Sequence, residues 1–458
     1  MTSRRLFLGL AASLALLAGC ASTPSIEEAP PIVFVHGNGD TGGLWQATMW
    51  RFESNGWPRE RLHAIDVPYP SARDDDSKPQ AGRTSAAEHM AYLKAEVDKV
   101  LKATGARKVV LIGNSRGGNA IRNYIQNGGG EQTVSHAILG GTPNHGVWAV
   151  KGRNEGNEFS GTGPFLTALN APKNAAGDEV IGPVKWLTIR SDSNDKFAQP
   201  RGQWIGDKDL VTNVTAAGPE LKGAMNVVIP HIDHRETSYS PAAFEASYSF
   251  ITGKASKTMD IRTETQAVLN GKITGLGLNP ADPKTGNFSN NLPLGGAQLA
   301  VFAVDPATGQ RSGSAVHSKT VGADGLWGPF AARPGVPYEF VITAPGYATT
   351  HIYRSGFPRS SNIIHLRAER IAEADKEAKS VITFVRPRGY FNPPRDKISF
   401  DGQTPPPGVP TGAGVASSKI KLPQEGERAI SAEFNGERIT GRTWSATQNH
   451  AVVLELTY

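Results

Sequence analysis

The feature that most constrains this chain is a Gly-x-Ser-x-Gly pentapeptide that lies between an apolar segment and a segment with helical character. An apolar, mostly β-branched run, residues 109–112, precedes it, and the chain continues as a predicted helix through Tyr124. A strand that turns directly into a helix leaves no room for side chains at Gly113 and Gly117, and it holds the Ser115 hydroxyl at the strand's end. The helix N-terminus beside the serine can stabilise a developing oxyanion. The pattern therefore predicts a catalytic nucleophile at Ser115.

A serine hydroxyl needs a neighbouring base, and the base needs a carboxylate that fixes its tautomer. The predicted strand 184–189 is followed by a loop that contains two aspartates. We favour Asp195 as the acid, with Asp192 as the alternative. The base is expected after the next apolar run, in the loop before the final helix of this part of the chain. His234 is the preferred base, and His231 is the alternative.

The oxyanion hole is predicted from the segment that follows the first apolar strand, residues 31–35. This strand ends at His36-Gly37-Asn38-Gly39, where the glycines let the main chain approach a reacting carbonyl. The main-chain amides of Asn38 and Arg116 are the predicted donors to the oxyanion.

Neither a cofactor nor a metal is predicted. His231, Asp233 and His234 lie close together in the sequence and offer an alternative metal site, but no further His or Cys cluster accompanies them. The formal net charge of +6 is spread over 458 residues without a basic run. Binding to nucleic acid is therefore not expected.

The N-terminal residues are expected to lie outside the fold. Ser3-Arg4-Arg5-Leu6-Phe7-Leu8 matches a twin-arginine export signal, and the apolar segment 9–18 is too short to remain in a membrane as a spanning helix. Cys20, the only cysteine, follows Leu17-Ala18-Gly19 as in a bacterial lipoprotein box and is the predicted lipidation site. Residues 1–20 are thus a predicted signal and 21–29 a tether. The protein is expected to be exported, as a periplasmic or outer-membrane lipoprotein or in secreted form.

Predicted strands and helices alternate between residues 30 and 254. The segment 86–104 has an apolar face at helical spacing, and apolar strands follow at 135–139 and 225–229 before a helix at 242–251. This alternation predicts an α/β fold with a mostly parallel sheet that helices cover on both faces.

From about residue 258 the pattern changes to short alternating segments between turn residues. It predicts an antiparallel β-sandwich over residues 258–370 and a second small β-domain over 371–458. A charged helix over 369–379 is expected to mark the boundary between them.

Together, Phe34-Val35-His36-Gly37, Gly113-Asn114-Ser115-Arg116-Gly117 and Asp233-His234 resemble the α/β-hydrolase superfamily, and within it the bacterial lipases, over residues 31–252. Residues 52–58 and 353–357 are similar to parts of archaeal long-chain lipases of the Archaeoglobus type. In those lipases a minimal hydrolase is followed by a β-domain that contributes to lipid binding. Asn114 and Arg116 depart from the family, which usually has His and Met beside the serine.

The resemblance implies a serine carboxylic-ester hydrolase, a lipase that cleaves acyl esters through an acyl-enzyme, and the predicted signal adds that it is exported. The same triad would also suit a polyester depolymerase or a short-chain esterase, and a non-catalytic surface-binding lipoprotein is the alternative from another class. The segment 147–180 lies where this superfamily inserts caps, so Trp148, Phe159, Phe165 and Leu166 are candidates for the substrate pocket.

The β-rich half is expected to present a water-insoluble substrate to the catalytic face. Its aromatic residues near predicted turns could either contact lipid at an exposed rim or fill the core of the sandwich. These residues are Trp327, Tyr353 and Phe357.

Overall fold

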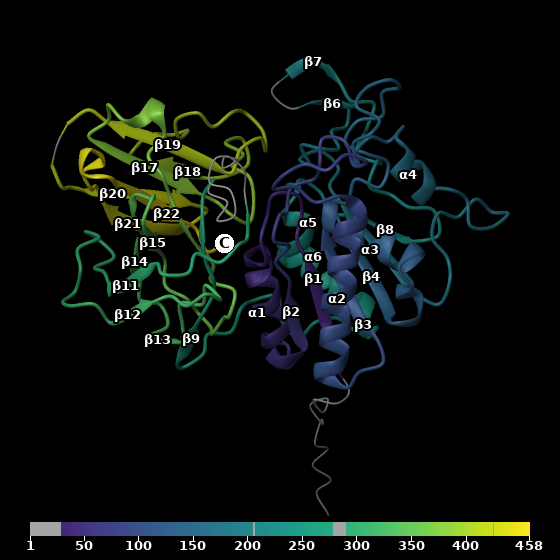
Figure 1. Cartoon of the computed structure of the whole chain (residues 1–458), viewed down its shortest axis with the longest axis horizontal. Coiled ribbons are helices and arrows are strands. Elements are labelled where there is room, and N and C mark those ends of the chain that lie inside the picture. Colours follow the sequence, from purple (N-terminus) through teal and green to yellow (C-terminus); the bar gives the residue numbers. More distant parts are fainter. Residues whose placement is uncertain (1–28, 205–206, 278–289, 425) are drawn as a thin grey trace, which may run out of the picture.

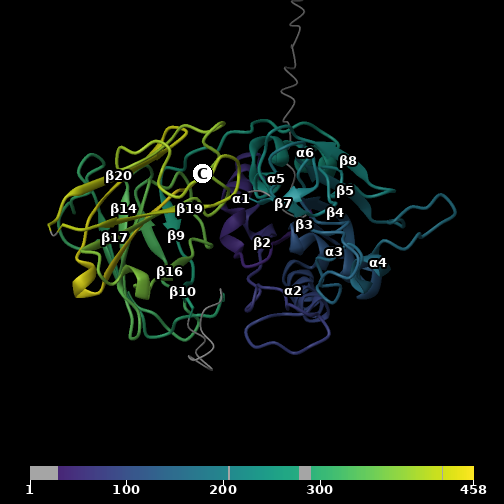
Figure 2. The ribbon, with the colours of Figure 1, turned by 90° about the horizontal axis from the view of Figure 1, so that it is seen from above.

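The computed structural model describes residues 29–204, 207–277, 290–424 and 426–458. An α/β part and a β-rich part lie side by side, as two perpendicular views agree (Figures 1 and 2). In the part of the chain that is described, no helix is long and apolar enough to cross a membrane. The predicted signal at 1–20 and its Cys20 lie outside the described residues.

The α/β part alternates strands and helices as predicted. Its elements, in chain order, are β1 (Ile32–Val35), α1 (Gln46–Ser54), β2 (Leu62–Ala64), α2 (Ala86–Thr104), β3 (Val109–Asn114), α3 (Arg116–Asn127), β4 (Val134–Gly140), α4 (Pro164–Leu169), β5 (Lys185–Arg190), β6 (Gln203–Trp204), β7 (Asp207–Val211), β8 (Met225–Val228), α5 (Glu236–Tyr239) and α6 (Pro241–Thr252).

Six of these strands form one parallel sheet in the order β2-β1-β3-β4-β5-β8. Alternate residues of each strand enter opposite cores, because successive side chains point to opposite faces. Phe34 packs with residues of α1 and α6, whereas Val33 and Val35 pack with residues of α2 and α3. Helices thus cover both faces of the sheet, and the predicted α/β class is confirmed.

The β-rich part contains fourteen described strands. They are β9 (Ala267–Leu269), β10 (Ile273–Gly275), β11 (Gln298–Ala303), β12 (His317–Thr320), β13 (Phe330–Ala332), β14 (Tyr338–Thr343), β15 (Thr349–Arg354), β16 (Leu366–Ala368), β17 (Ser380–Val385), β18 (Ile398–Phe400), β19 (Ser417–Leu422), β20 (Ala429–Phe434), β21 (Glu437–Arg442) and β22 (His450–Glu455).

Strands from both sides of residue 370 share one seven-stranded sheet in the order β12-β11-β14-β15-β22-β17-β19. Its pairs are antiparallel except around β22, which runs parallel to β15 and to β17. The β-rich half is confirmed, and a domain boundary near residue 370 stays a prediction. The charged helix expected over 369–379 is wrong. Only a 3₁₀ turn, Glu373–Asp375, forms there, and the Asp375 carboxylate pairs with Lys419 at 2.6 Å and with Lys421 at 2.7 Å.

Of the two roles left open for the three aromatic residues, lipid contact and core packing, the structure shows core packing. Trp327 and Phe357 are fully buried and Tyr353 is 1% exposed. The Trp327 indole N–H donates to the Ile364 carbonyl at 2.8 Å, and the Tyr353 hydroxyl donates to Glu339 at 3.0 Å. Their polar atoms therefore have partners inside the fold, and their rings are not available to lipid.

Helix α1 joins the two parts. Trp50 belongs to the core of the β-rich part, and its indole N–H donates to the Ser360 carbonyl at 2.8 Å. The Arg51 guanidinium donates to the Met259 carbonyl at 2.9 Å. An element of the α/β part is thus buried in the neighbouring core, which fixes the two parts to each other.

Candidate active site

The predicted nucleophile lies in a strained turn between β3 and α3. Ser115 has φ 53° and ψ −123°, a left-handed conformation that is costly for a residue with a side chain. A Cβ at Gly117 would lie 2.4 Å from the Val35 carbonyl oxygen, and one at Gly113 would lie 2.7 Å from the Ile121 Cδ1. Both glycines of the pentapeptide are therefore required by close packing, as the sequence argument proposed.

The preferred acid and base are in direct contact. The His234 Nδ1 lies 2.9 Å from each carboxylate oxygen of Asp195, and both side chains are almost fully buried. The Phe197 ring packs edge to face with the imidazole, with 4.5 Å between ring centroids. The His234 Nε2 is buried and bonds to no described residue. A carboxylate at Nδ1 leaves Nε2 available as the basic atom.

The alternative acid and base, Asp192 and His231, contact each other at the surface. The Asp192 carboxylate accepts the His231 main-chain N–H at 2.9 Å, and the His231 Nδ1 lies 4.0 Å from the same oxygen. Their side chains are 40% and 74% exposed. The hydrogen bond from His231 lowers the pKa of the Asp192 carboxyl. The geometry therefore favours Asp195 and His234 as the acid and base.

Asn114, one of the two departures from the family pattern, connects the serine turn to the histidine loop. Its Nδ2 donates to the Gly140 carbonyl at 3.2 Å and to the His234 carbonyl at 3.1 Å. The Ser115 amide donates to the same Gly140 carbonyl at 2.9 Å. Asn114 thus links the loop of the predicted base to the Gly140 carbonyl, which also holds the turn of the predicted nucleophile. No hydrogen bond between Ser115 and His234 is formed in this structure, and catalytic hydrogen bonds are often loose before substrate binds.

The side chain of Arg116, the second departure, does not line the cavity that contains Ser115. It is fully buried and forms a bidentate ion pair with Glu158, at 2.7 and 2.8 Å, and it donates to the Pro70 carbonyl at 3.0 Å. The guanidinium therefore serves packing, which leaves only the main-chain amide of Arg116 for the predicted oxyanion hole.

A cavity of about 300 Å³ opens beside Ser115. Asn38 lines it, and its side-chain oxygen accepts the Ala72 main-chain N–H at 2.7 Å. Two of the pocket candidates, Trp148 and Phe159, lie in the lining. The remaining lining residues are Val147, Arg153, Phe197, Trp204, Leu210 and Thr212.

The other two pocket candidates, Phe165 and Leu166, do not line this cavity. They lie on α4. The Arg122 guanidinium on α3 donates a hydrogen bond to the Leu169 carbonyl of α4 at 3.1 Å. Leu166 is fully buried there. Trp204 and Leu210, which the sequence reasoning missed, occupy the cavity side instead. They belong to the short strands β6 and β7, whose only signal in the sequence was two apolar pairs, at 204–205 and 210–211, in a polar stretch.

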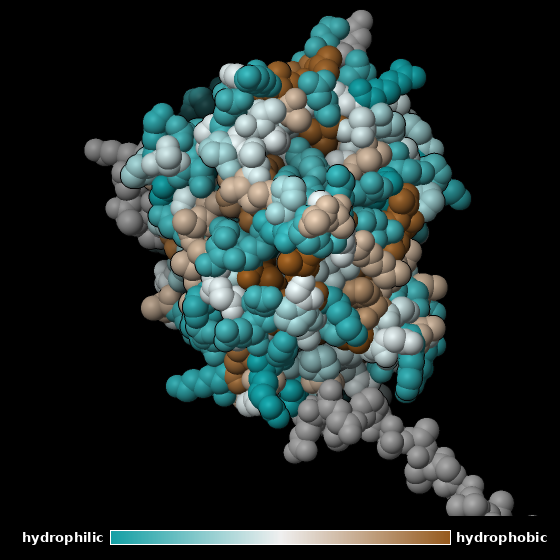
Figure 3. Space-filling view, turned by 90° about the vertical axis from the view of Figure 1, so that its right-hand side faces the viewer, coloured by the Kyte–Doolittle hydropathy of each residue, from teal (hydrophilic) through white to brown (hydrophobic). Residues whose placement is uncertain are grey.

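The face of the α/β part that points away from the β-rich half is mostly hydrophilic (Figure 3). Apolar residues gather on it in small separate areas, one of them at the end where the β6–β7 hairpin projects in Figure 1. Val211 of that hairpin is 48% exposed.

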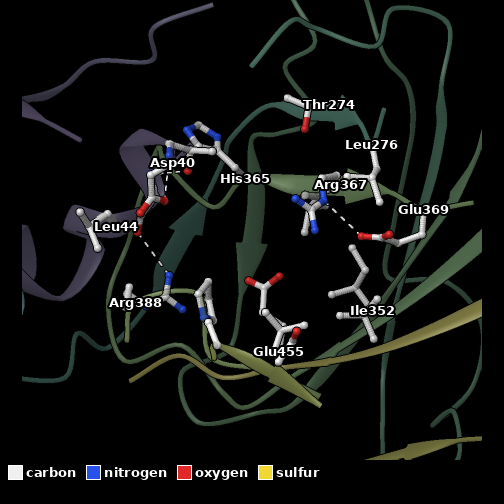
Figure 4. Close-up of a pocket in the computed structure, with 18 of the residues that line it drawn as sticks. Asp40, Leu44, Thr274, Leu276, Ile352, His365, Arg367, Glu369, Arg388 and Glu455 are labelled. Atoms are coloured by element: carbon white, nitrogen blue, oxygen red, sulfur yellow. Dashed lines mark hydrogen bonds and ion pairs between the residues drawn. The ribbon is translucent and has the colours of Figure 1, made fainter. Parts of the chain in front are cut away.

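A larger cavity of about 430 Å³ lies between the two parts and contains none of the three predicted catalytic residues (Figure 4). Charged side chains line it. Arg388 donates to the Gly43 carbonyl at 3.2 Å, and Arg367 pairs with Glu369 at 3.1 Å. Among the described residues, no group of three or more His, Cys, Asp or Glu side chains is arranged to hold a metal ion. Asp233, from the alternative metal set, instead accepts the main-chain N–H groups of Arg235 and Glu236.

Two family models match this chain. The family model for class 2 lipases matches residues 29–176, and that for the lipase C-terminal domain matches residues 265–371. Similar solved structures include the Bacillus licheniformis lipase BlEst2 in its propeptide form, with 14% identity over 91% of this chain and 93% of that one and a TM-score of 0.35. Its mature form is 21% identical over 49% and 89%, with a TM-score of 0.30. The Bacillus subtilis carboxylesterase CesB is 14% identical over 50% and 85%, with a TM-score of 0.29.

The two family matches together cover more than half of the chain, and the first includes the serine turn. They agree with the parallel sheet and with the β-rich half that follows it. The chain therefore belongs to the bacterial lipases of the α/β-hydrolase superfamily and is a serine hydrolase of the lipase and carboxylesterase type.

Proposed function

We propose that this lipase-type hydrolase is exported and cleaves acyl esters through an acyl-enzyme on Ser115. The observation that carries the proposal is the contact between His234 Nδ1 and Asp195 at the end of the sheet where the strained Ser115 turn lies. A buried carboxylate at Nδ1 fixes the histidine tautomer in which Nε2 accepts a proton.

In the proposed mechanism the Ser115 oxygen attacks the ester carbonyl carbon while its proton passes to His234 Nε2. The main-chain amides of Asn38 and Arg116 stabilise the tetrahedral oxyanion. The carbon–oxygen bond to the alcohol then breaks, and the alcohol leaves with the proton from His234. Water, deprotonated by the same histidine, hydrolyses the acyl-serine and restores the enzyme.

The apolar lining of the Ser115 cavity supports an acyl chain as the group that binds beside the serine. Phe197, Trp204 and Leu210 supply carbon surface, and the cavity of about 300 Å³ is at the small end of ligand sites in general. A small cavity favours esters with short or medium acyl chains among the lipase and esterase substrates. A short-chain esterase is therefore the second candidate function.

The test combines ester hydrolysis with covalent trapping. The wild-type protein and Ser115→Ala are compared on p-nitrophenyl esters from acetate to palmitate, and a fluorophosphonate probe is located by mass spectrometry. We expect labelling at Ser115 alone and a loss of kcat of about 10⁵-fold or more in the variant. Hydrolysis by Ser115→Ala within a hundredfold of wild type, or labelling at another serine, would refute the mechanism.

Export and anchoring are a separate part of the proposal. They are supported by the Arg4-Arg5 signal pattern and by Cys20 after Leu17-Ala18-Gly19. In a bacterial host, Cys20→Ala should release the protein from the membrane fraction while it is still exported, and radiolabelled palmitate should enter only the parent protein. Equal labelling of both would exclude Cys20 as the lipidated residue.

A further inference from the structure

We propose that the segment of residues 386–396, which belongs to the β-rich half, positions both the catalytic acid and the catalytic base. This inference rests on the proposed function and extends it to residues outside both family matches, which end at residues 176 and 371. Arg386 is the central positioning residue.

Arg386 holds the loop that carries His234. Its Nη1 donates to the Asp233 carboxylate at 2.8 Å, and its Nη2 donates to Glu236 at 2.6 Å and to the Tyr239 hydroxyl at 2.7 Å. Asp233 precedes the histidine directly and is fully buried, as is nearly all of Arg386. One guanidinium therefore bonds to residues on both sides of the catalytic base.

Asp233 connects Arg386 to the main chain around His234 through hydrogen bonds. One carboxylate oxygen accepts the Tyr390 main-chain N–H and the Arg386 guanidinium, each at 2.8 Å. The other accepts the main-chain N–H groups of Arg235 at 2.8 Å and Glu236 at 2.9 Å. Because both oxygens are fully used, a movement of Arg386 would move the turn in which His234 lies.

The same segment holds the loop that carries Asp195. The Asn392 amide donates to Asn194 at 2.9 Å, and the Lys196 ammonium lies 4.3 Å from the centre of the Tyr390 ring. Asn194 and Lys196 flank the acid directly. The acid and the base are thus fixed to one stretch of chain, although they come from different loops of the α/β part.

Arg395 completes the attachment at the entry to the histidine loop. Its guanidinium donates to the His231 carbonyl at 2.9 Å and to Glu236 at 2.5 Å. Arg386 and Arg395 thereby supply two cations opposite the fully buried Asp233 carboxylate and the partly buried Glu236 carboxylate. Displacing a reacting group by about 1 Å can cost about a hundredfold in rate, so such an attachment is catalytically significant.

The test compares Arg386→Met and Arg386→Lys with Arg354→Met in the full-length protein. Arg354 is a matched control, because it is 1% exposed and pairs with Glu455 at 2.8 Å entirely within the β-rich half. We expect Arg386→Met to lower kcat by about 10–100-fold with KM within about threefold. Arg386→Lys should recover part of the rate, because it keeps the charge opposite Asp233. Arg354→Met should retain kcat within about threefold while lowering the melting temperature.

A double-mutant cycle separates positioning from general stability. Once Asp195→Asn has disabled the acid, Arg386→Met should lower kcat by no more than about threefold, because residues of one catalytic unit are not additive. Asn392→Ala, which removes only the contact to Asn194, provides a milder variant and should lower kcat by about 3–10-fold. The kcat of Asn392→Ala tests the inference even if Arg386→Met does not fold.

Additive losses in the cycle, or an equal fall in kcat for Arg354→Met, would overturn the inference. So would unchanged kcat in both Asn392→Ala and Arg386→Lys. Failure of the proposed function would look different, because Ser115→Ala would then remain active whatever the Arg386 variants do.

Discussion

Replacement of Glu158 by alanine is expected to destabilise the α/β part strongly while leaving the chemical step almost unchanged. Glu158 is 2% exposed, and it forms a bidentate pair with the fully buried Arg116 at 2.7 and 2.8 Å. Burial raises the pKa of the Glu158 carboxyl, and Arg116 offsets only part of this effect. Removing the carboxylate leaves an uncompensated guanidinium inside the protein. Breaking a buried pair in this way costs about 3–5 kcal/mol.

The assay is thermal unfolding followed by far-ultraviolet circular dichroism, with ester hydrolysis at 25 °C as the second readout. For a folding unit of this size, about 1 kcal/mol corresponds to about 2–4 °C, so the melting temperature should fall by about 6–20 °C. The activity of the folded variant should stay within about threefold, because α3 fixes the Arg116 amide through its main chain.

Asp98→Ala is the matched control. Its carboxylate pairs with Lys94 at 2.8 Å on α2, where both side chains are about half exposed. Solvent-exposed pairs contribute little, so this variant should change the melting temperature by no more than about 2 °C. If Glu158→Ala were as stable as Asp98→Ala, the reasoning from burial would be refuted.

Three further predictions concern the acid, the pocket and pH. Asp195→Asn should lower kcat by about 10³–10⁴-fold and Asp192→Asn by less than threefold; the reverse order would transfer the acid's role to Asp192. Trp204→Ala and Leu210→Ala should change the acyl-chain preference in the ester series, whereas Phe165→Ala should not; a shift in Phe165→Ala alone would place the pocket on α4. The Glu179 carboxylate lies 2.8 Å from the His145 Nε2 and raises the pKa of His145. The pair therefore stabilises the fold fully below the usual histidine pKa of about 6.5, and this stabilisation is lost as the pH rises through the raised pKa. His145→Gln should therefore lower the melting temperature more at pH 5 than at pH 9, and an equal loss at both would contradict the pairing.

Part of this fold could be predicted from the sequence, because the interactions that determine it lie within single segments. The helix at 86–104 begins with the Ser85–Glu88 capping box and ends at Gly105, where φ is 67°. The turn at Ser115 follows from two glycines at which any side chain would overlap neighbouring atoms. Helical spacing and glycine sterics act within a few residues, so one segment is enough to predict them.

The β-rich half could be predicted only in part, because the pairing of its strands is not local in the sequence. Alternating segments predicted its strands, but β15 and β17 both pair with β22, which is 65 or more residues later in the chain. Strand pattern alone gives no partner or direction. The roles of Trp327 and Phe357 likewise depended on which residues surround them, and tertiary packing placed both in the core.

The amino-acid sequence by itself determined the strand, turn and helix around Ser115, because these depend on glycine sterics and apolar periodicity within one segment. Tertiary structure decided which carboxylate meets His234, since Asp192 and Asp195 lie in the same loop and differ only in what the fold packs around them. It also decided the use of Arg386, whose partners are about 150 residues away. Burial and long-range contact give a side chain its role there, and neither is encoded in the residues beside it.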